Sequence, residues 1–232
     1  MRLAPFALFT GLLPLFCVHL TYAIAASHGH VDWCVPYWDS CTSISATGRE
    51  LPEKLVFKLL MLPASLCALA FWWCANQWLR VGIGRSSRAM LVTGGIAALF
   101  LMLYVVALGE STEYRWARQT GIILFFSLTY VAQLCFLVRV ARAALRPAVI
   151  GPVFRWQCRA AGLLLGIGVL SVVLDAAWGG YDSVEDAFEW VMMLFIALQF
   201  CSHYPLWKGA DLRISISGGG AAPDTHESKP HH

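Results

Sequence analysis

The chain has few charged residues. Asp, Glu, Lys and Arg make up 13% of its 232 residues, about half of the ~25% that is usual in soluble domains. No polar stretch is long enough to fold as a sizeable soluble domain, and no basic stripe with interleaved aromatic residues occurs. The net charge of +3 therefore does not indicate binding to nucleic acid. These absences favour a protein made of one membrane domain.

Several common catalytic motifs are also missing. The chain contains neither HExxH nor HxxxH, no G-x-S-x-G surrounds a serine, and its cysteines do not form C-x-x-C pairs. His28 and His30 lie close to Asp32, but a His-x-His pair in a loop is a signal of low specificity for zinc. We therefore predict no metal site and no cofactor.

Apolar residues are abundant and clustered. They make up 58% of the chain, and the mean hydropathy is +0.62. Each cluster is close to the roughly 20 residues that a membrane-spanning helix needs. Because backbone groups in hydrocarbon must be paired internally, we predict an all-α, six-helix transmembrane bundle. The predicted spans are 4–26, 55–79, 89–109, 119–140, 158–178 and 187–207.

The first span has an alternative interpretation. Arg2, an apolar run and the small residues Ala23-Ile24-Ala25 resemble a signal peptide with its cleavage site. The apolar run is longer than the usual core of a signal peptide, and Trp33 and Tyr37 follow it like interfacial anchors. We favour a retained helix.

The basic residues predict the orientation. Twelve of the 17 Lys and Arg residues lie at the N-terminus, in the second and fourth loops and in the tail. These intervals share one side of the membrane, which we predict to be cytoplasmic together with both termini. Eleven of the 14 acidic residues lie on the opposite side. We predict a membrane domain over 1–209, with an outer loop at 27–54, and a disordered polar tail over 210–232.

Small and polar residues within the spans indicate how the helices meet. Gly94 with Ala98 and Gly162 with Gly166 have the small-xxx-small spacing of close helix contacts, which we expect inside one bundle. Gln133 and Gln199 are mid-membrane polar groups, and we predict hydrogen bonds between helices there rather than a transport path.

The outer loop carries a recognisable pattern. It contains CVPY at 34–37, SISATG at 43–48, then Pro52 and the basic Lys58. The last span begins with FEW at 188–190 and closes with His203 and WKG at 207–209. With six spans, these two patterns resemble the DRAM-type family. That family joins the damage-regulated autophagy modulators, the second post-GPI-attachment lipid-remodelling factor and the N-terminal part of a yeast cell-wall biogenesis protein.

Two positions depart from the family pattern. Many members carry a His near the start of the fourth helix, where this chain has RQTG at 118–121, so only the glycine matches. Cys41 has no counterpart in the family pattern. A disulfide between Cys34 and Cys41 is therefore not a family feature, although an oxidising compartment would allow one.

The resemblance implies a function that handles lipids. It is closest to the GPI-remodelling branch, which implies exchange or presentation of acyl chains at the outer or lumenal face, with membrane lipids as partners. Whether such proteins are enzymes stays open. The alternatives are a non-enzymatic modulator of the autophagy-modulator type, with a protein partner in the membrane, and a small transporter. The expected location is the endoplasmic reticulum or Golgi membrane in a eukaryote and the cytoplasmic membrane in a bacterium.

Glu189 is the first candidate for a catalytic residue. It stands at the outer start of the sixth span and is followed by apolar residues, and an ionisable group at membrane depth is a functional candidate by default. Asp175, near the end of the fifth span, could pair with it, since two close carboxylates can divide acid and base roles. Without a catalytic role, Glu189 would simply form an ion pair, and Asp175 would be an acidic residue at the membrane interface.

The predicted lipid head-group site surrounds these acids on the outer side. Lys58 and Arg118 are the predicted partners of Glu189, and Ser43 and Ser45 either bind the head group or simply stabilise a turn. His203 lies at the opposite end of its helix from Glu189 and either bonds the last carbonyl groups or has a separate role. The predicted head-group residues are Ser43, Ser45, Gly48, Lys58, Arg118 and Gln119.

Labelling from one side of the membrane tests the predicted orientation. In sealed vesicles of known sidedness, the S45C variant should react with a membrane-impermeant thiol reagent added on the outer or lumenal side. The parent chain supplies the background labelling. Reaction from the cytoplasmic side alone would reverse the predicted topology.

Overall fold

A computed structural model describes residues 3–110, 112–143 and 150–209, and these form helices without strands. The six long helices are α1 (Ala4–Ser27), α3 (Glu53–Ile83), α4 (Arg88–Ala107), α5 (Arg115–Ala141), α6 (Ile150–Ala177) and α7 (Glu185–Cys201). Six helical segments are long and apolar enough to cross a membrane, the last of them running from Glu185 to Gly209. The predicted six-helix membrane fold is confirmed, and the side on which the termini lie stays a prediction.

Short elements connect and extend the spans. They are α2 (Pro36–Asp39), η1 (Ala46–Gly48), η2 (Thr112–Tyr114), η3 (Tyr181–Ser183) and α8 (His203–Gly209). The sixth predicted span is divided at Ser202 into α7 and α8, while the other spans agree with prediction to within a few residues except for α6, which begins earlier. The predicted tail over 210–232 lies outside the described residues.

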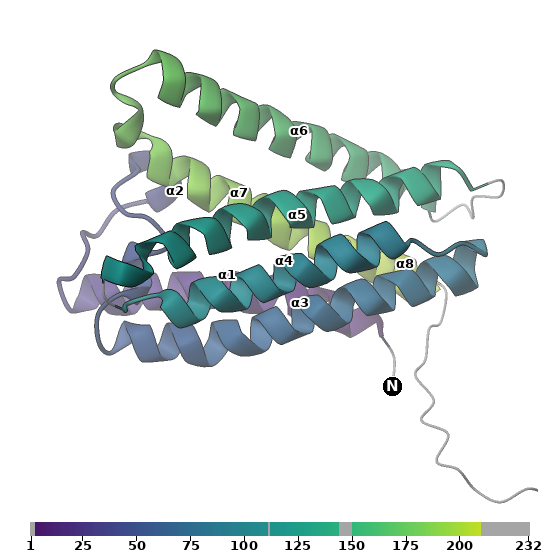
Figure 1. The fold of residues 1–232 in the computed structure, drawn as a ribbon, viewed down its shortest axis with the longest axis horizontal. Coiled ribbons are helices and arrows are strands. Elements are labelled where there is room, and N and C mark those ends of the chain that lie inside the picture. The colour runs from purple at the N-terminus through teal and green to yellow at the C-terminus, as the bar shows by residue number, and fades with distance from the viewer. Residues whose placement is uncertain (1–2, 111, 144–149, 210–232) are drawn as a thin grey trace, which may run out of the picture.

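The helices are not equally packed. In Figure 1, α1, α3, α4 and α5 run alongside one another, α7 crosses the bundle, and α6 diverges from α5 towards the end that carries α2. Helix α6 is the least buried of the spans, and Val172 on it is 68% exposed. The backbones of α5 and α7 approach each other at few points, although a side-chain hydrogen bond joins Gln133 to Gln199. The bundle is therefore closely packed from α1 through α3 and α4 to α5, whereas the backbones of α5 and α7 lie further apart.

An aromatic cluster fills the end of the bundle opposite the outer loop. The buried ring of His203 lies 4.9 Å from that of Phe71 and 4.7 Å from that of Phe136, and Trp207 packs against Phe71. The Trp78 indole donates a hydrogen bond of 3.1 Å to the carbonyl oxygen of Leu206 in α8. Since aromatic side chains bury large areas, this cluster fixes α3, α5 and α8 relative to one another.

The two pairs of small residues behave differently. A Cβ atom on Gly94 would lie 2.3 Å from Cγ of Trp72, so this glycine allows α4 to pack closely on α3, as expected. Gly162 and Gly166 have nothing within 4 Å of such an atom and are exposed. The expectation that they pack inside the bundle is therefore wrong, because α6 lies at its edge.

The predicted hydrogen bond between spans is confirmed. The Gln133 side-chain amide on α5 donates to the side-chain oxygen of Gln199 on α7 over 3.3 Å. The Gln199 amide in turn donates to the backbone oxygen of Gln157 on α6 over 3.4 Å. These bonds link three helices in the half of the bundle away from the outer loop.

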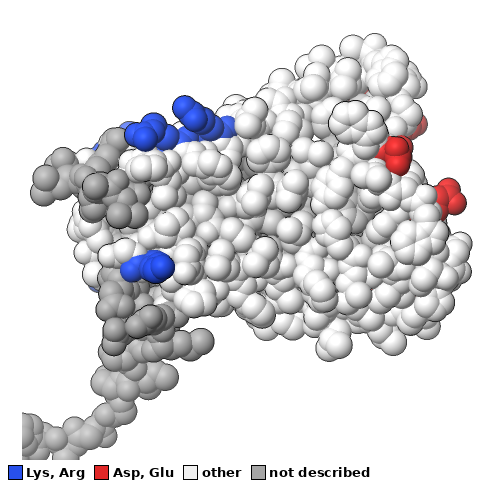
Figure 2. Space-filling view, turned by 180° about the vertical axis from the view of Figure 1, so that it is seen from behind, with Lys and Arg blue, Asp and Glu red and all other residues white. Residues whose placement is uncertain are grey.

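Charged side chains mark the two ends of the molecule. On the face shown in Figure 2, basic residues lie at one end and acidic residues at the other, with an uncharged surface between them. A charge-free band of this kind fits the hydrocarbon layer of a bilayer.

The contact between Gly94 and Trp72 gives a testable prediction. The G94A variant should lower the free energy of unfolding by about 1–3 kcal/mol, because the added methyl group overpacks the buried contact. G95A is the matched control, since its Cβ atom would meet Leu69 at an ordinary 3.6 Å. Thermal unfolding in detergent compares the two, and equal midpoints would contradict the packing described.

Candidate functional site

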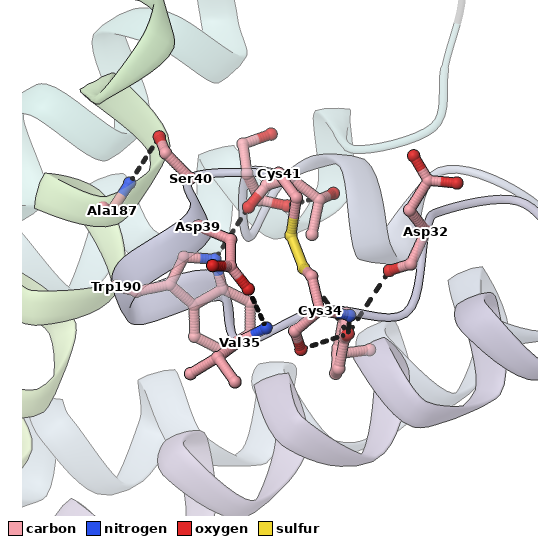
Figure 3. Close-up of a disulfide and its surroundings, with 11 residues drawn as sticks. Asp32, Cys34, Val35, Asp39, Ser40, Cys41, Ala187 and Trp190 are labelled. Carbon is pink, nitrogen blue, oxygen red and sulfur yellow. Dashed lines mark hydrogen bonds between the residues drawn. A yellow bond between two sulfur atoms is a disulfide. The ribbon is translucent and has the colours of Figure 1, made fainter.

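The outer loop is attached to α7 by three hydrogen bonds. The backbone N–H of Ile44 donates to Oε2 of Glu189 over 3.0 Å. The Trp190 indole donates to the carbonyl oxygen of Thr42 over 2.8 Å, and the Ala187 N–H donates to Oγ of Ser40 over 3.1 Å (Figure 3). The loop is thus held against the outer end of α7 by residues nearly 150 positions away in the sequence.

The first half of the loop is attached to α1. Cys34 and Cys41 form a disulfide, which Figure 3 places beside Trp190. The Cys34 N–H donates to the Tyr22 hydroxyl over 2.7 Å, and that hydroxyl donates to the Cys34 carbonyl oxygen over 2.8 Å. The Tyr37 hydroxyl and Nε2 of His19 are 3.0 Å apart. The loop is consequently tied to both α1 and α7.

The two candidate serines stabilise a turn. Oγ of Ser43 accepts the N–H of Ala46 over 3.1 Å and lies 3.1 Å from Oγ of Ser45. The Arg49 guanidinium donates to Oγ of Ser45 over 3.0 Å. A Cβ atom on Gly48 would lie 2.9 Å from Leu108 and 3.0 Å from Phe57, so only glycine lets this turn sit so deep in the bundle. Ser43 and Ser45 therefore stabilise the turn, and their role in binding a head group stays a prediction.

A long apolar cavity lies beneath this turn. About 550 Å³ of space lies between its lining atoms, including the gaps between neighbouring side chains and the open space at its mouth. Ile44 and Glu189 lie at its outer end, and Thr10, Ala68 and Phe200 lie at the opposite end. Five helices line it: α1, α3, α4, α5 and α7. The lining residues are Thr10, Pro14, Val18, Ile44, Phe57, Met61, Ala64, Ala68, Leu101, Tyr104, Ile122, Phe125, Phe126, Glu189, Met193, Ile196, Ala197 and Phe200.

Only three polar side chains line the cavity. The Thr10 hydroxyl is bonded to the backbone oxygen of Phe6 in its own helix over 2.9 Å. The Glu189 carboxylate accepts the Ile44 N–H through one oxygen. The hydroxyl of Tyr104 is buried and has no hydrogen-bond partner among the described residues. The lining is therefore apolar along most of the cavity and polar near Glu189.

The predicted basic partners of Glu189 lie elsewhere. The Lys58 ammonium is 2.7 Å from the Glu110 carboxylate, and Lys54 is 3.1 Å from it. Arg118 donates to the Glu110 backbone oxygen over 3.4 Å. Both predicted partners thus gather around Glu110, which sequence reasoning did not single out. Hydrogen bonds from Lys58 and then Lys54 lower the pKa of the Glu110 carboxyl from its usual 4.5.

The other predicted site residues are also separated from Glu189. Asp175 and Gln119 are exposed, and no described contact joins either of them to Glu189. His203 is buried at the far end of the bundle, where its Nδ1 lies 3.0 Å from the Gln199 backbone oxygen. The structure therefore brings together Glu189 and the turn from Ser43 to Gly48, and it does not bring Asp175, Lys58, Arg118, Gln119 or His203 to them.

A second acidic residue is buried nearby. Oε1 of Glu53, at the start of α3, lies 2.6 Å from Nδ1 of His30, and its Oε2 is buried without a partner among the described residues. No group of three or more potential metal ligands occurs in the described part of the chain. Sequence reasoning missed Glu53 because an acid next to a proline at a helix start is usually an exposed cap.

Comparison with known proteins returned one match. A family model described as Frag1/DRAM/Sfk1/Cwh43P N-terminal domain matches residues 2–205. Neither the curated proteins nor the solved structures searched gave a significant match. The matched region includes the outer loop, Glu189 and the spanning helices up to residue 205.

The ion pairs of Glu110 predict a dependence of stability on pH. Because the pKa of Glu110 is lower in the folded protein than its usual 4.5, its contribution to stability is present above that value and is lost as the pH falls through the lowered pKa. The E110Q variant should therefore lose less stability than the parent chain between pH 7 and acid pH. Thermal unfolding measured across this range, with E113Q at an exposed neighbouring acid as control, tests this. Parallel curves for E110Q and the parent would contradict it.

Proposed function

Because the chain belongs to the Frag1/DRAM/Sfk1/Cwh43P N-terminal domain family, we propose that it handles membrane lipids of the class changed in GPI-anchor lipid remodelling. In this proposal the cavity holds one acyl chain of the lipid, and the head group lies at Glu189 beneath the outer loop. The protein exchanges that chain or presents it for exchange at the outer or lumenal face. The observation that carries the proposal is the pairing of a long apolar cavity with one carboxylate at its outer end.

The shape of the cavity supports an acyl chain as its occupant. Along α3 its lining runs from Phe57 to Ala68, and along α7 from Glu189 to Phe200. Either stretch covers twelve residues, and its eleven rises of 1.5 Å span ~16 Å. A narrow apolar space of this length suits an extended hydrocarbon chain better than a compact polar solute.

The outer end of the cavity supports a polar head group. The backbone N–H of Ile44 orients the Glu189 carboxylate, and an ionised carboxylate can accept several hydrogen bonds at once. Hydroxyl or amino groups of a head group would be suitable donors. Arg49, bonded to Ser45 on the turn above, is exposed and could meet a phosphate there.

The loose packing between α5 and α7 supports entry from the bilayer. The backbones of these two helices approach each other at few points, and both helices line the cavity. The bond between Gln133 and Gln199 joins them in the half of the bundle away from the outer loop. Ile122 and Phe126 on α5 are half-buried at this seam. We infer that an acyl chain passes sideways between α5 and α7, which spares it a passage through water.

A transporter of polar solutes is less well supported. Gln133 and Gln199, the polar groups in the middle of the membrane, are bonded to each other. Apart from Glu189 at its outer end, no charged side chain lines the cavity. A route for polar solutes would need such groups along its length.

Lipid analysis of cells that lack the protein tests the proposal. Their lipids should have an altered acyl composition, and the parent chain should restore it. E189Q should restore it poorly, with activity lowered roughly ten- to hundredfold, because hydrogen bonds to a charged group are worth about 1.5–3 kcal/mol. The glutamine oxygen still accepts the Ile44 N–H, so the loop should stay in place and expression should be normal.

The matched control is E185Q, which removes an exposed carboxylate one turn earlier on the same helix. It should restore the lipids as well as the parent chain does. An unchanged acyl composition in cells without the protein would contradict lipid remodelling and favour a non-enzymatic modulator. Full activity of E189Q would show that the Glu189 carboxylate is not needed at the site.

A further inference from the structure

Tyr104 carries a hydroxyl group with no internal partner. The residue is 2% exposed, and its oxygen is buried and unbonded among the described residues. Tyr104 lines the same cavity as Glu189. Tyr22 and Tyr37 both pack against Trp190, and their hydroxyls are bonded to Cys34 and to His19 respectively. Tyr104 is therefore distinct among the tyrosines around the site.

The surrounding helices fix the position of this tyrosine. A Cβ atom on Gly121 would lie 3.0 Å from Tyr104 N and from Tyr104 Cβ, so α5 packs directly on the backbone of α4 at this residue. The ring of Phe57 meets the Tyr104 ring edge to face, with centroids 6.2 Å apart. Such tight contacts leave the ring little freedom to turn its hydroxyl elsewhere.

An unbonded hydroxyl is costly at this place. Burying it without a partner costs about 1–3 kcal/mol, whereas phenylalanine would fill nearly the same space without that cost. A hydroxyl that faces a cavity can regain its hydrogen bond from a ligand. The position of Tyr104 thus points to a ligand with a hydrogen-bond acceptor near the outer end of the cavity.

The depth of Tyr104 and Glu189 within their helices limits which groups of a lipid could reach both side chains. Tyr104 lies three residues before the outer end of α4 and Glu189 four residues after the start of α7, which places both ~5–6 Å inside the helix ends. In a lipid the ester joins the acyl chain to the head-group end, so a chain that fills the cavity would place its ester near Tyr104 and Glu189. The tyrosine hydroxyl can donate a hydrogen bond, and an ionised carboxylate can only accept.

We propose that Tyr104 binds the ester carbonyl of the acyl chain in the cavity, while Glu189 accepts a hydrogen bond from a free hydroxyl next to that ester. This inference rests on the proposed function and specifies its substrate class. The lipid is an ester-linked glycerolipid with a hydroxyl group beside the ester. An ether-linked chain lacks the acceptor that Tyr104 needs.

Binding of an ester and of its ether analogue tests this assignment. The purified chain in detergent is titrated with a monoacylglycerol and with the monoalkylglycerol of the same chain length, and intrinsic tryptophan fluorescence reports the dissociation constants. The parent chain should bind the ester roughly three- to tenfold more tightly, the value of one hydrogen bond. Y104F should bind the ester as weakly as the ether and should leave ether binding unchanged.

Two further measurements separate a binding role from a structural one. Y130F removes a hydroxyl from α5 beside a different, smaller cavity, and it should keep the preference for the ester. The ligand-free Y104F protein should unfold at the same temperature as the parent or higher, because a buried unbonded hydroxyl has been removed. A lower unfolding temperature for Y104F would show that the hydroxyl has an internal partner and would overturn the assignment.

The remaining outcomes distinguish the two proposals. If the parent chain binds neither lipid, the lipid-handling function fails and this inference fails with it. If the parent binds both equally, or if Y104F keeps the preference for the ester, lipid binding stands and the role of Tyr104 is wrong.

Discussion

The hydrogen bond from the Ile44 N–H to the Glu189 carboxylate is the contact on which the candidate site depends. Each group would be costly alone, because a buried N–H needs an acceptor and a carboxylate at membrane depth needs a donor. Together they satisfy each other and join the outer loop to the last spanning helix. Trp190 strengthens the junction through Thr42. The loop therefore closes the outer end of an apolar cavity and holds an acidic side chain at that end.

The placement of the other charges leaves this carboxylate free of lysine partners. Lys54 and Lys58 both bond Glu110, beside the α4–α5 connection. His30 bonds Glu53 at the start of α3. Opposite charges on the outer side are thus paired locally, and Glu189 faces the cavity with one backbone donor. A carboxylate in this state can recognise the hydroxyl or amino group of a ligand, which a lysine partner would otherwise exclude.

The six spans could be predicted from the sequence because a membrane helix depends on local hydropathy and length. The hydrogen bond between Gln133 and Gln199 could also be predicted, because polar side chains within hydrocarbon have few other partners. The partners of Glu189 could not be predicted, since Lys58 and Arg118 share its end of the bundle but lie around Glu110. Tyr104 was missed because a tyrosine near a helix end usually indicates an interfacial anchor. Whether Gly162 packs against another helix depends on the position of α6, which the spacing of small residues does not determine.

Crosslinking with a lipid that carries a photoreactive group in its acyl chain tests the central claim most directly. After irradiation in vesicles, the adducts are mapped by mass spectrometry. If the cavity holds an acyl chain, adducts should form on residues along its length, such as Met61 and Met193. Adducts confined to bilayer-facing residues such as Val172 would contradict a lipid-binding cavity beneath the outer loop.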